Sequence, residues 1–105
     1  MKSMAEIEMD YRNAMNQARE LDQLANRLST QANMTFPGIL SEVSSAWQGE
    51  NANAYLQKAK KLQPRINKAA GDLRRTAQTI RTVAQNTYRA EKRAYEIAME
   101  RVYGG

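Results

Sequence analysis

The 105-residue sequence contains no cysteine and no histidine, and it has one tryptophan, one phenylalanine and two prolines. Without cysteine, the chain forms neither a disulfide framework nor a thiolate nucleophile or metal site. Without histidine, it lacks the commonest acid–base group and metal ligand near neutral pH. No motif arranges its carboxylates or hydroxyls to activate a nucleophile or to bind a metal. We therefore expect no catalytic site, no metal site, no cofactor and no small-molecule substrate.

Long apolar runs are missing as well. No segment approaches the roughly 20 apolar residues that a membrane-spanning helix needs. The N-terminal segment carries Glu6, Glu8 and Asp10 where a secretory signal peptide has its apolar region. We expect a chain that does not span a membrane, that is cytoplasmic when made, and that uses a route other than the general secretory pathway if it is exported.

The net charge of +5 is unevenly distributed. Residues 1–48 hold four basic and six acidic side chains, whereas residues 49–105 hold twelve basic and five acidic ones. Two interpretations follow: the basic half pairs with the acidic half of the same chain, or it binds nucleic acid or an anionic membrane. No aromatic residue that stacks on bases lies between Tyr55 and Tyr88, and the first interpretation is favoured. The cations concerned are Lys58, Lys60, Lys61, Arg65, Lys68, Arg74, Arg75 and Arg81.

Apolar residues recur at steps of three and four in both halves, which is the heptad pattern of packed helices. The pattern predicts one helix over residues 3–46 and another over 51–103. Pro37 predicts a kink or a restart at residues 34–38, with Thr35 as the new N-cap, and Pro64 predicts a kink in the second helix. The predicted helix-packing and dimer seam comprises Ile7, Tyr11, Ala14, Ala18, Leu21, Ala25, Leu28, Leu62, Ile66, Ala69, Leu73, Ala77, Ile80 and Ala84.

The break between the two helical patterns falls at Trp47-Gln48-Gly49, where glycine allows a tight reversal at about residues 47–50. We therefore expect an all-α chain: one domain over residues 1–105, with two long antiparallel helices in a helix–turn–helix hairpin. A two-helix rod leaves one apolar edge in water, and we expect dimerisation into a four-helix bundle, as a homodimer or a heterodimer. The reversal also places the acids of residues 6–10 near the cations of residues 89–93, and the acids of residues 20–22 near the cations of residues 74–81.

A chain of this length with two heptad helices and Trp47-Gln48-Gly49 between them resembles the WXG100 (ESAT-6-like) family. The resemblance covers nearly the whole chain. It implies a small protein secreted by the type VII (ESX/Ess) machinery, acting by helix–helix contact as a secreted effector or as an escort partner. The implied partners are another WXG100-like chain, a larger type VII toxin or the secretion ATPase. The alternative is a cytosolic basic helical-bundle protein that binds nucleic acid or an anionic membrane.

One feature of that family is incomplete in this sequence. Its export signal is commonly Tyr-x-x-x-Asp/Glu, and Tyr88, Glu91 and Tyr95 are the candidates here. Glu91 follows Tyr88 by three positions, and Tyr95 is followed at the fourth position by a methionine. We therefore expect a partner chain to supply the signal.

Overall fold

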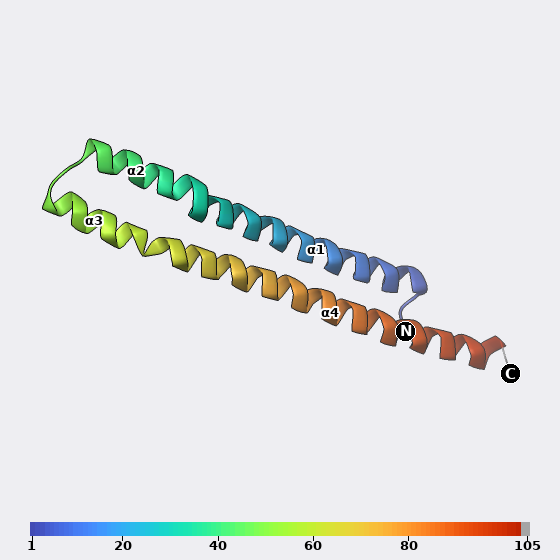
Figure 1. Cartoon of the computed structure of the whole chain (residues 1–105). Coiled ribbons are helices and arrows are strands. Elements are labelled where there is room, and N and C mark those ends of the chain that lie inside the picture. The colour runs from blue at the N-terminus through green and yellow to red at the C-terminus, as the bar shows by residue number, and fades with distance from the viewer. Residues whose placement is uncertain (104–105) are drawn as a thin grey trace. The chain divides into compact units, whose positions relative to one another are not determined.

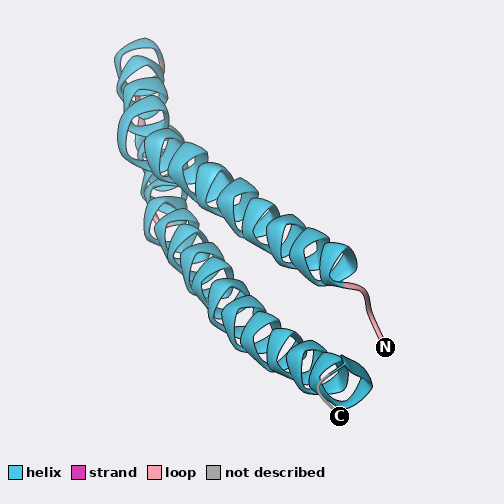
Figure 2. Cartoon of the chain, turned by 90° about the vertical axis from the view of Figure 1, so that its right-hand side faces the viewer, coloured by secondary structure: helices cyan, strands magenta, loops and turns pink. Residues whose placement is uncertain are grey.

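The computed structural model describes residues 1–103, and helix accounts for nearly all of them (Figure 1). The elements are α1 (Met4–Thr30), the π-helical turn η1 (Gln31–Thr35), α2 (Phe36–Ala46), α3 (Glu50–Lys60) and α4 (Leu62–Tyr103). Within residues 1–103 there is no strand, and loop precedes α1 (Figure 2). The predicted all-α fold class, with two long helical stretches joined by one turn, is confirmed. Gly104 and Gly105, at which the second helix was expected to end, lie outside the described residues.

The chain divides into two compact units, each made of two helical segments. Unit 1 comprises Met1–Leu21 and Arg75–Gly105, and unit 2 is Asp22–Arg74. In unit 1 the start of α1 lies beside the second half of α4, and in unit 2 the segment from Asp22 to Ala46 lies beside α3 and the start of α4. That the two units form one domain stays a prediction.

The core of both units consists mainly of alanine. No side chain larger than isoleucine or leucine reaches the buried class, and several alanines are fully buried. Small side chains let two helices approach closely, but each removes little apolar area from water. The helices within each unit therefore pack closely but bury little apolar surface. The buried residues are Ile7, Ala18, Ala25, Ala32, Ala52, Leu56, Ala70, Ala77 and Ala84.

The predicted seam matches this core in α1 and in the second half of α4, and it is shifted in between. Five of its residues are buried: Ile7, Ala18, Ala25, Ala77 and Ala84. Seven are half-buried: Tyr11, Ala14, Leu21, Leu28, Ile66, Leu73 and Ile80.

Leu62 and Ala69, by contrast, are exposed, and Leu56 and Ala70 are the buried residues in that stretch. For packing within the chain, the seam assigned to these two positions is wrong. The reason is that the line Leu56, Gln63 and Ala70 runs one residue from the more apolar line Tyr55, Leu62 and Ala69, and the sequence pattern alone does not tell which line faces the neighbouring helix.

The expected restart near Pro37 takes the form of a π-helical turn. The N–H of Phe36 donates to the carbonyl oxygen of Gln31, five residues earlier. Thr35 has helical dihedrals and makes no side-chain cap, so the interpretation of Thr35 as a new N-cap is wrong. A proline ring clashes with the carbonyl of the residue four positions earlier, here Asn33. Widening one turn accommodates that clash without ending the helix.

The effect of Pro64 appears three residues before the proline itself. The chain leaves the α-helical pattern at Lys61, whose N–H donates to the carbonyl oxygen of Lys58 at 3.2 Å. Pro64 is then the third residue of α4, where a missing N–H costs no intrahelical hydrogen bond. The predicted kink is therefore a break between α3 and α4.

Candidate helix–helix interface

An exposed apolar line repeats every seven residues along α3 and α4. We call it the outer seam: Tyr55, Leu62, Ala69, Thr76, Val83, Ala90 and Ile97. All seven residues are exposed, with Tyr55 at 59%, Leu62 at 45% and Val83 at 57%. A single exposed leucine is ordinary on a protein surface, but an apolar line at heptad spacing is the pattern of a helix that packs against another helix.

The outer seam lies one residue away from the line that the chain itself buries. Leu56, Ala70, Ala77 and Ala84 follow the outer-seam residues by one position and are buried. The helical stretch from Glu50 to Tyr103 therefore has two adjacent apolar faces, one packed within its own unit and one in water. A helix of a four-helix bundle needs both faces, because it contacts two neighbours.

In unit 1 the outer seam borders an apolar groove of about 360 Å³. Ile7 and Tyr11 of α1 line one wall, and Ile80, Val83 and Thr87 of α4 line the other. Three charged residues, Lys2, Asp10 and Glu91, close one end of it. The groove thus offers apolar walls of the kind on which a helix packs.

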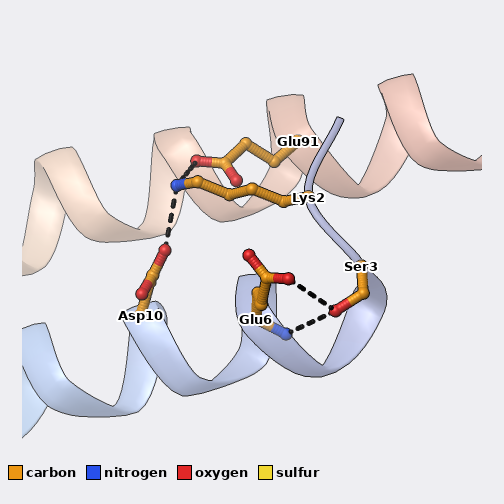
Figure 3. Close-up of polar contacts among 5 residues, drawn as sticks. All are labelled: Lys2, Ser3, Glu6, Asp10 and Glu91. Atoms are coloured by element: carbon orange, nitrogen blue, oxygen red, sulfur yellow. Dashed lines mark hydrogen bonds and ion pairs between the residues drawn. The ribbon is translucent and has the colours of Figure 1, made fainter.

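The charged end of the groove is organised by Lys2, as Figure 3 shows. Its Nζ donates to Asp10 Oδ2 at 2.9 Å and to Glu91 Oε1 at 3.2 Å. The hydrogen bond to Asp10 and then that to Glu91 raise the pKa of the Lys2 ammonium. Below it, the N–H of Glu6 donates to Ser3 Oγ at 3.2 Å, which caps the N-terminus of α1.

The predicted pairing of charges is only partly the one observed. At this end Lys2 joins an acid of its own segment to an acid of α4, so the bridging cation comes from the N-terminus and not from residues 89–93. In unit 2, Arg74 donates to neutral partners, Asn26 Oδ1 at 3.2 Å and Ser29 Oγ at 3.0 Å. Sequence reasoning missed Lys2, although a cation just before the first helix is a signal for such a bridge.

The incomplete export-signal residues lie in the packed part of unit 1. The ring of Tyr88 packs on that of Tyr11, with centroids 4.9 Å apart, and Lys92 Nζ lies 5.9 Å from the Tyr88 centroid. Glu91 is half-buried, and its Oε2 is buried without a hydrogen-bond partner within residues 1–103. Tyr95 is half-buried. Tyr88 and Glu91 are thus engaged in contacts with the N-terminal segment.

Unit 2 contains a cluster of amide side chains that the sequence analysis did not identify. Asn33 Nδ2 donates to Asn67 Oδ1 at 3.1 Å, and Asn67 Nδ2 donates back to Asn33 Oδ1 at 3.0 Å. Gln63 Nε2 adds a bond to Asn33 Oδ1 at 3.4 Å. Asn33 and Asn67 lie about equally far from the turn along the sequence, and this spacing could have indicated that they face each other. A reciprocal amide pair fixes the register of two helices, because a shift of one turn breaks both bonds.

The turn residues Trp47, Gln48 and Gly49 connect α2 to α3. Gly49 has φ 119°, a backbone conformation that disfavours any residue with a Cβ. Its carbonyl accepts a hydrogen bond from the N–H of Asn53 at 3.0 Å, within the first turn of α3. The ring of Trp47 is 46% exposed and packs on Tyr55 at 5.7 Å, so the turn places an aromatic ring beside the first residue of the outer seam.

A family model for the PPE family matches residues 4–102, almost the entire chain. The chain belongs to the PPE family. PPE proteins are mycobacterial proteins secreted by type VII (ESX) systems, they are related to the ESAT-6/WXG100 helical hairpins, and they pair with PE proteins as helical heterodimers. They are not known as enzymes. No curated protein and no solved structure matches the chain.

The match replaces the expected family by a related one, since membership of the WXG100 family itself is not shown. The link to type VII secretion that the resemblance implied is supported at the level of the family. Neither the match nor the fold favours the nucleic-acid or membrane alternative. Within residues 1–103, no helix is both long and apolar enough to cross a bilayer.

Proposed function

We propose that this PPE-family chain is a type VII secretion substrate or escort that works as one half of a helical pair. A partner chain, PE-like or WXG100-like, lays its helices along the outer seam and completes a four-helix bundle. The exposed heptad line from Tyr55 to Ile97 carries this proposal. It is a second apolar face on helices whose first face is already packed.

The composition of the core supports the same conclusion. Alanines bury little area, while larger apolar side chains such as Val83 and Ile97 stay in water. A partner helix on this face removes more apolar surface from water per residue than the alanine contacts do. Association with a partner therefore stabilises the folded chain as well as joining two proteins.

The partner also supplies the export signal. Neither Tyr88 nor Tyr95 has an acid at the fourth following position, and Tyr88 and Glu91 are engaged with Tyr11 and Lys2. Export as a pair is consistent with a chain that lacks a complete signal of its own.

The test compares two substitutions on the same helix. Val83 lies on the outer seam, and Gln85 is exposed on a different face of the same helix. We expect the wild-type chain and Gln85→Lys to purify as a 1:1 complex with the PE-like or WXG100-like chain encoded beside the gene, and to reach the medium only when the type VII ATPase is present. Val83→Lys is expected to lose both complex and export, because a lysine in an apolar seam has no counter-charge. Export of Val83→Lys at the wild-type level would refute the proposal.

A further inference from the structure

Between Glu50 and Asp72, the charged side chains beside the outer seam of unit 2 are all cations, and Asp72, three positions after Ala69, is the acid that ends this stretch. Lys58 and Arg65 each follow a seam residue by three positions, so they lie immediately beside the seam on the helix surface. Lys61 and Lys68 lie on the next line outward, at the same seven-residue spacing. We call these four side chains the cationic rim: Lys58, Lys61, Arg65 and Lys68. They line the face of the helix opposite Leu56 and Ala70, which are buried within unit 2.

The cationic rim has no partner of its own in the described chain. All four residues are exposed, and within residues 1–103 their side chains make no hydrogen bond or ion pair. The sequence has no acidic residue between Glu50 and Asp72. The positive charge beside Tyr55 and Leu62 therefore has no acidic neighbour between Glu50 and Asp72, and Asp72 lies beside Ala69 at the end of this stretch.

Building on the proposed function, we infer that the partner segment docking on unit 2 is an acidic amphipathic helix from a different chain. Its apolar stripe packs on Tyr55, Leu62 and Ala69, and carboxylates along the side of that stripe next to the cationic rim meet the rim. Charges that flank a helix–helix seam select the partner and its orientation, since opposite charges attract across the seam and like charges repel.

A second copy of the chain does not offer this chemistry. In a two-fold pairing of outer seams, segment i meets segment j and segment j meets segment i. Centred within unit 2, the pairing sets the cationic rim against itself. Centred near Thr76, it sets the rim against residues 84–94 of the copy, where Arg89 and Arg93 are exposed cations and the single acid, Glu91, is already bonded to Lys2. Both arrangements place cations against cations.

The test uses the full chain and two synthetic helical peptides of four heptads with the same leucine and alanine stripe. One peptide carries glutamate at every flanking position, and the other carries lysine. We expect the acidic peptide to bind at least about tenfold more tightly than the basic one at low salt, with the difference shrinking as salt rises.

The double variant Lys58→Glu/Arg65→Glu is expected to lower the affinity for the acidic peptide about tenfold and to raise the affinity for the basic one. The matched control Arg19→Glu/Arg27→Glu, two exposed cations of α1, should leave both affinities unchanged.

Four outcomes would overturn the inference. The proposed function is tested separately, by the Val83→Lys variant. Equal, salt-insensitive binding of both peptides that is lost in Leu62→Ser keeps the seam as a docking face but removes the charge selection. A doubled mass of the chain alone, reduced to monomer by Leu62→Ser, assigns the seam to a second copy. Tighter binding to phosphatidylglycerol vesicles than to the acidic peptide, lost in the rim variant, assigns the rim to a lipid surface. If the acidic peptide does not bind, an acidic helix is excluded as the occupant.

Discussion

The two units solve the same packing problem with different side chains. Both bring helices together over alanines, but unit 1 adds the Tyr11–Tyr88 ring pair and an apolar groove, whereas unit 2 adds the reciprocal Asn33–Asn67 amide pair. Their outer faces differ as well. Beside the outer seam, unit 2 presents four cations and no acid between Glu50 and Asp72, while the charges of residues 86–100 have both signs throughout.

The difference separates stability from specificity. Ring and aliphatic contacts tolerate small shifts between helices, and their energy follows the area removed from water. Amide pairs contribute less but depend on direction, and a uniform charge beside a seam excludes partners of the same sign. We therefore assign most of the packing energy to unit 1, and register and partner choice to unit 2.

The largest effect is expected from two neighbouring alanines of unit 2. Ala70 is fully buried and Ala69 is exposed on the outer seam. Ala70→Asp should destabilise the isolated chain by about 3–5 kcal/mol, because the carboxylate loses its water without gaining a partner. Ala69→Asp carries the same helix-propensity penalty of about 0.7 kcal/mol and little else. Urea unfolding followed by circular dichroism measures both, and equal losses would contradict the one-residue shift of the seam.

The second effect concerns the ring pair of unit 1. Tyr88→Ala should cost about 2 kcal/mol from lost apolar burial. A double-mutant cycle with Tyr11→Ala should return a coupling of about 0.5–1.5 kcal/mol, as expected for two aromatic rings in contact. The same cycle between Tyr11 and Tyr95, which is also half-buried on α4, is the control and should show no coupling. A coupling below experimental error for Tyr11 and Tyr88 would move the packing energy of unit 1 to its aliphatic residues.

The sequence predicted the fold class and much of the seam, because heptad spacing over many turns has few structural solutions. Ile7, Ala18, Ala25, Ala77 and Ala84 are predicted seam residues, and each is buried. Between Tyr55 and Ala70 the predicted line is not the buried one.

The stretch from Tyr55 to Ala70 shows why. Two adjacent apolar lines run through it, and the choice between them depends on the register of the facing helix. That register is set by the π-helical turn at Gln31–Thr35 and by the Asn33–Asn67 pair, both of which need atomic geometry. The ion pair at Lys2 was missed for a related reason: Lys2 reaches both Asp10 and Glu91 from a loop that helix periodicity does not place.

The third effect tests register in unit 2. Asn67→Ala removes both reciprocal bonds and should cost about 0.5–1.5 kcal/mol, reduced by the access of water to Asn33. The double variant Asn33→Leu/Asn67→Leu is expected to regain that stability and to lose register. Spin labels at two exposed positions, Arg27 and Lys68, report this by the width of their distance distribution. A distribution as narrow as that of the wild type would show that register is set elsewhere.

The smallest effect is expected from the ion pair of unit 1, since Lys2 and both of its partners are partly or fully open to water. Its hydrogen bonds to Asp10 and Glu91 raise the pKa of the Lys2 ammonium above its ordinary value. A raised pKa in the folded state means that the folded chain binds this proton more tightly than the unfolded chain does. The stabilisation is therefore complete below the ordinary pKa and is lost as the pH rises through the folded-state pKa.

At low salt and at pH 7 and 9, the wild type should have a higher melting temperature than Lys2→Met, and this difference should disappear at strongly alkaline pH. An arginine at this position stays charged at strongly alkaline pH, so the melting temperature of Lys2→Arg should remain above that of Lys2→Met. A gap for the wild type that persisted unchanged to the most alkaline pH would show that the aliphatic part of Lys2, and not its charge, closes the end of the groove.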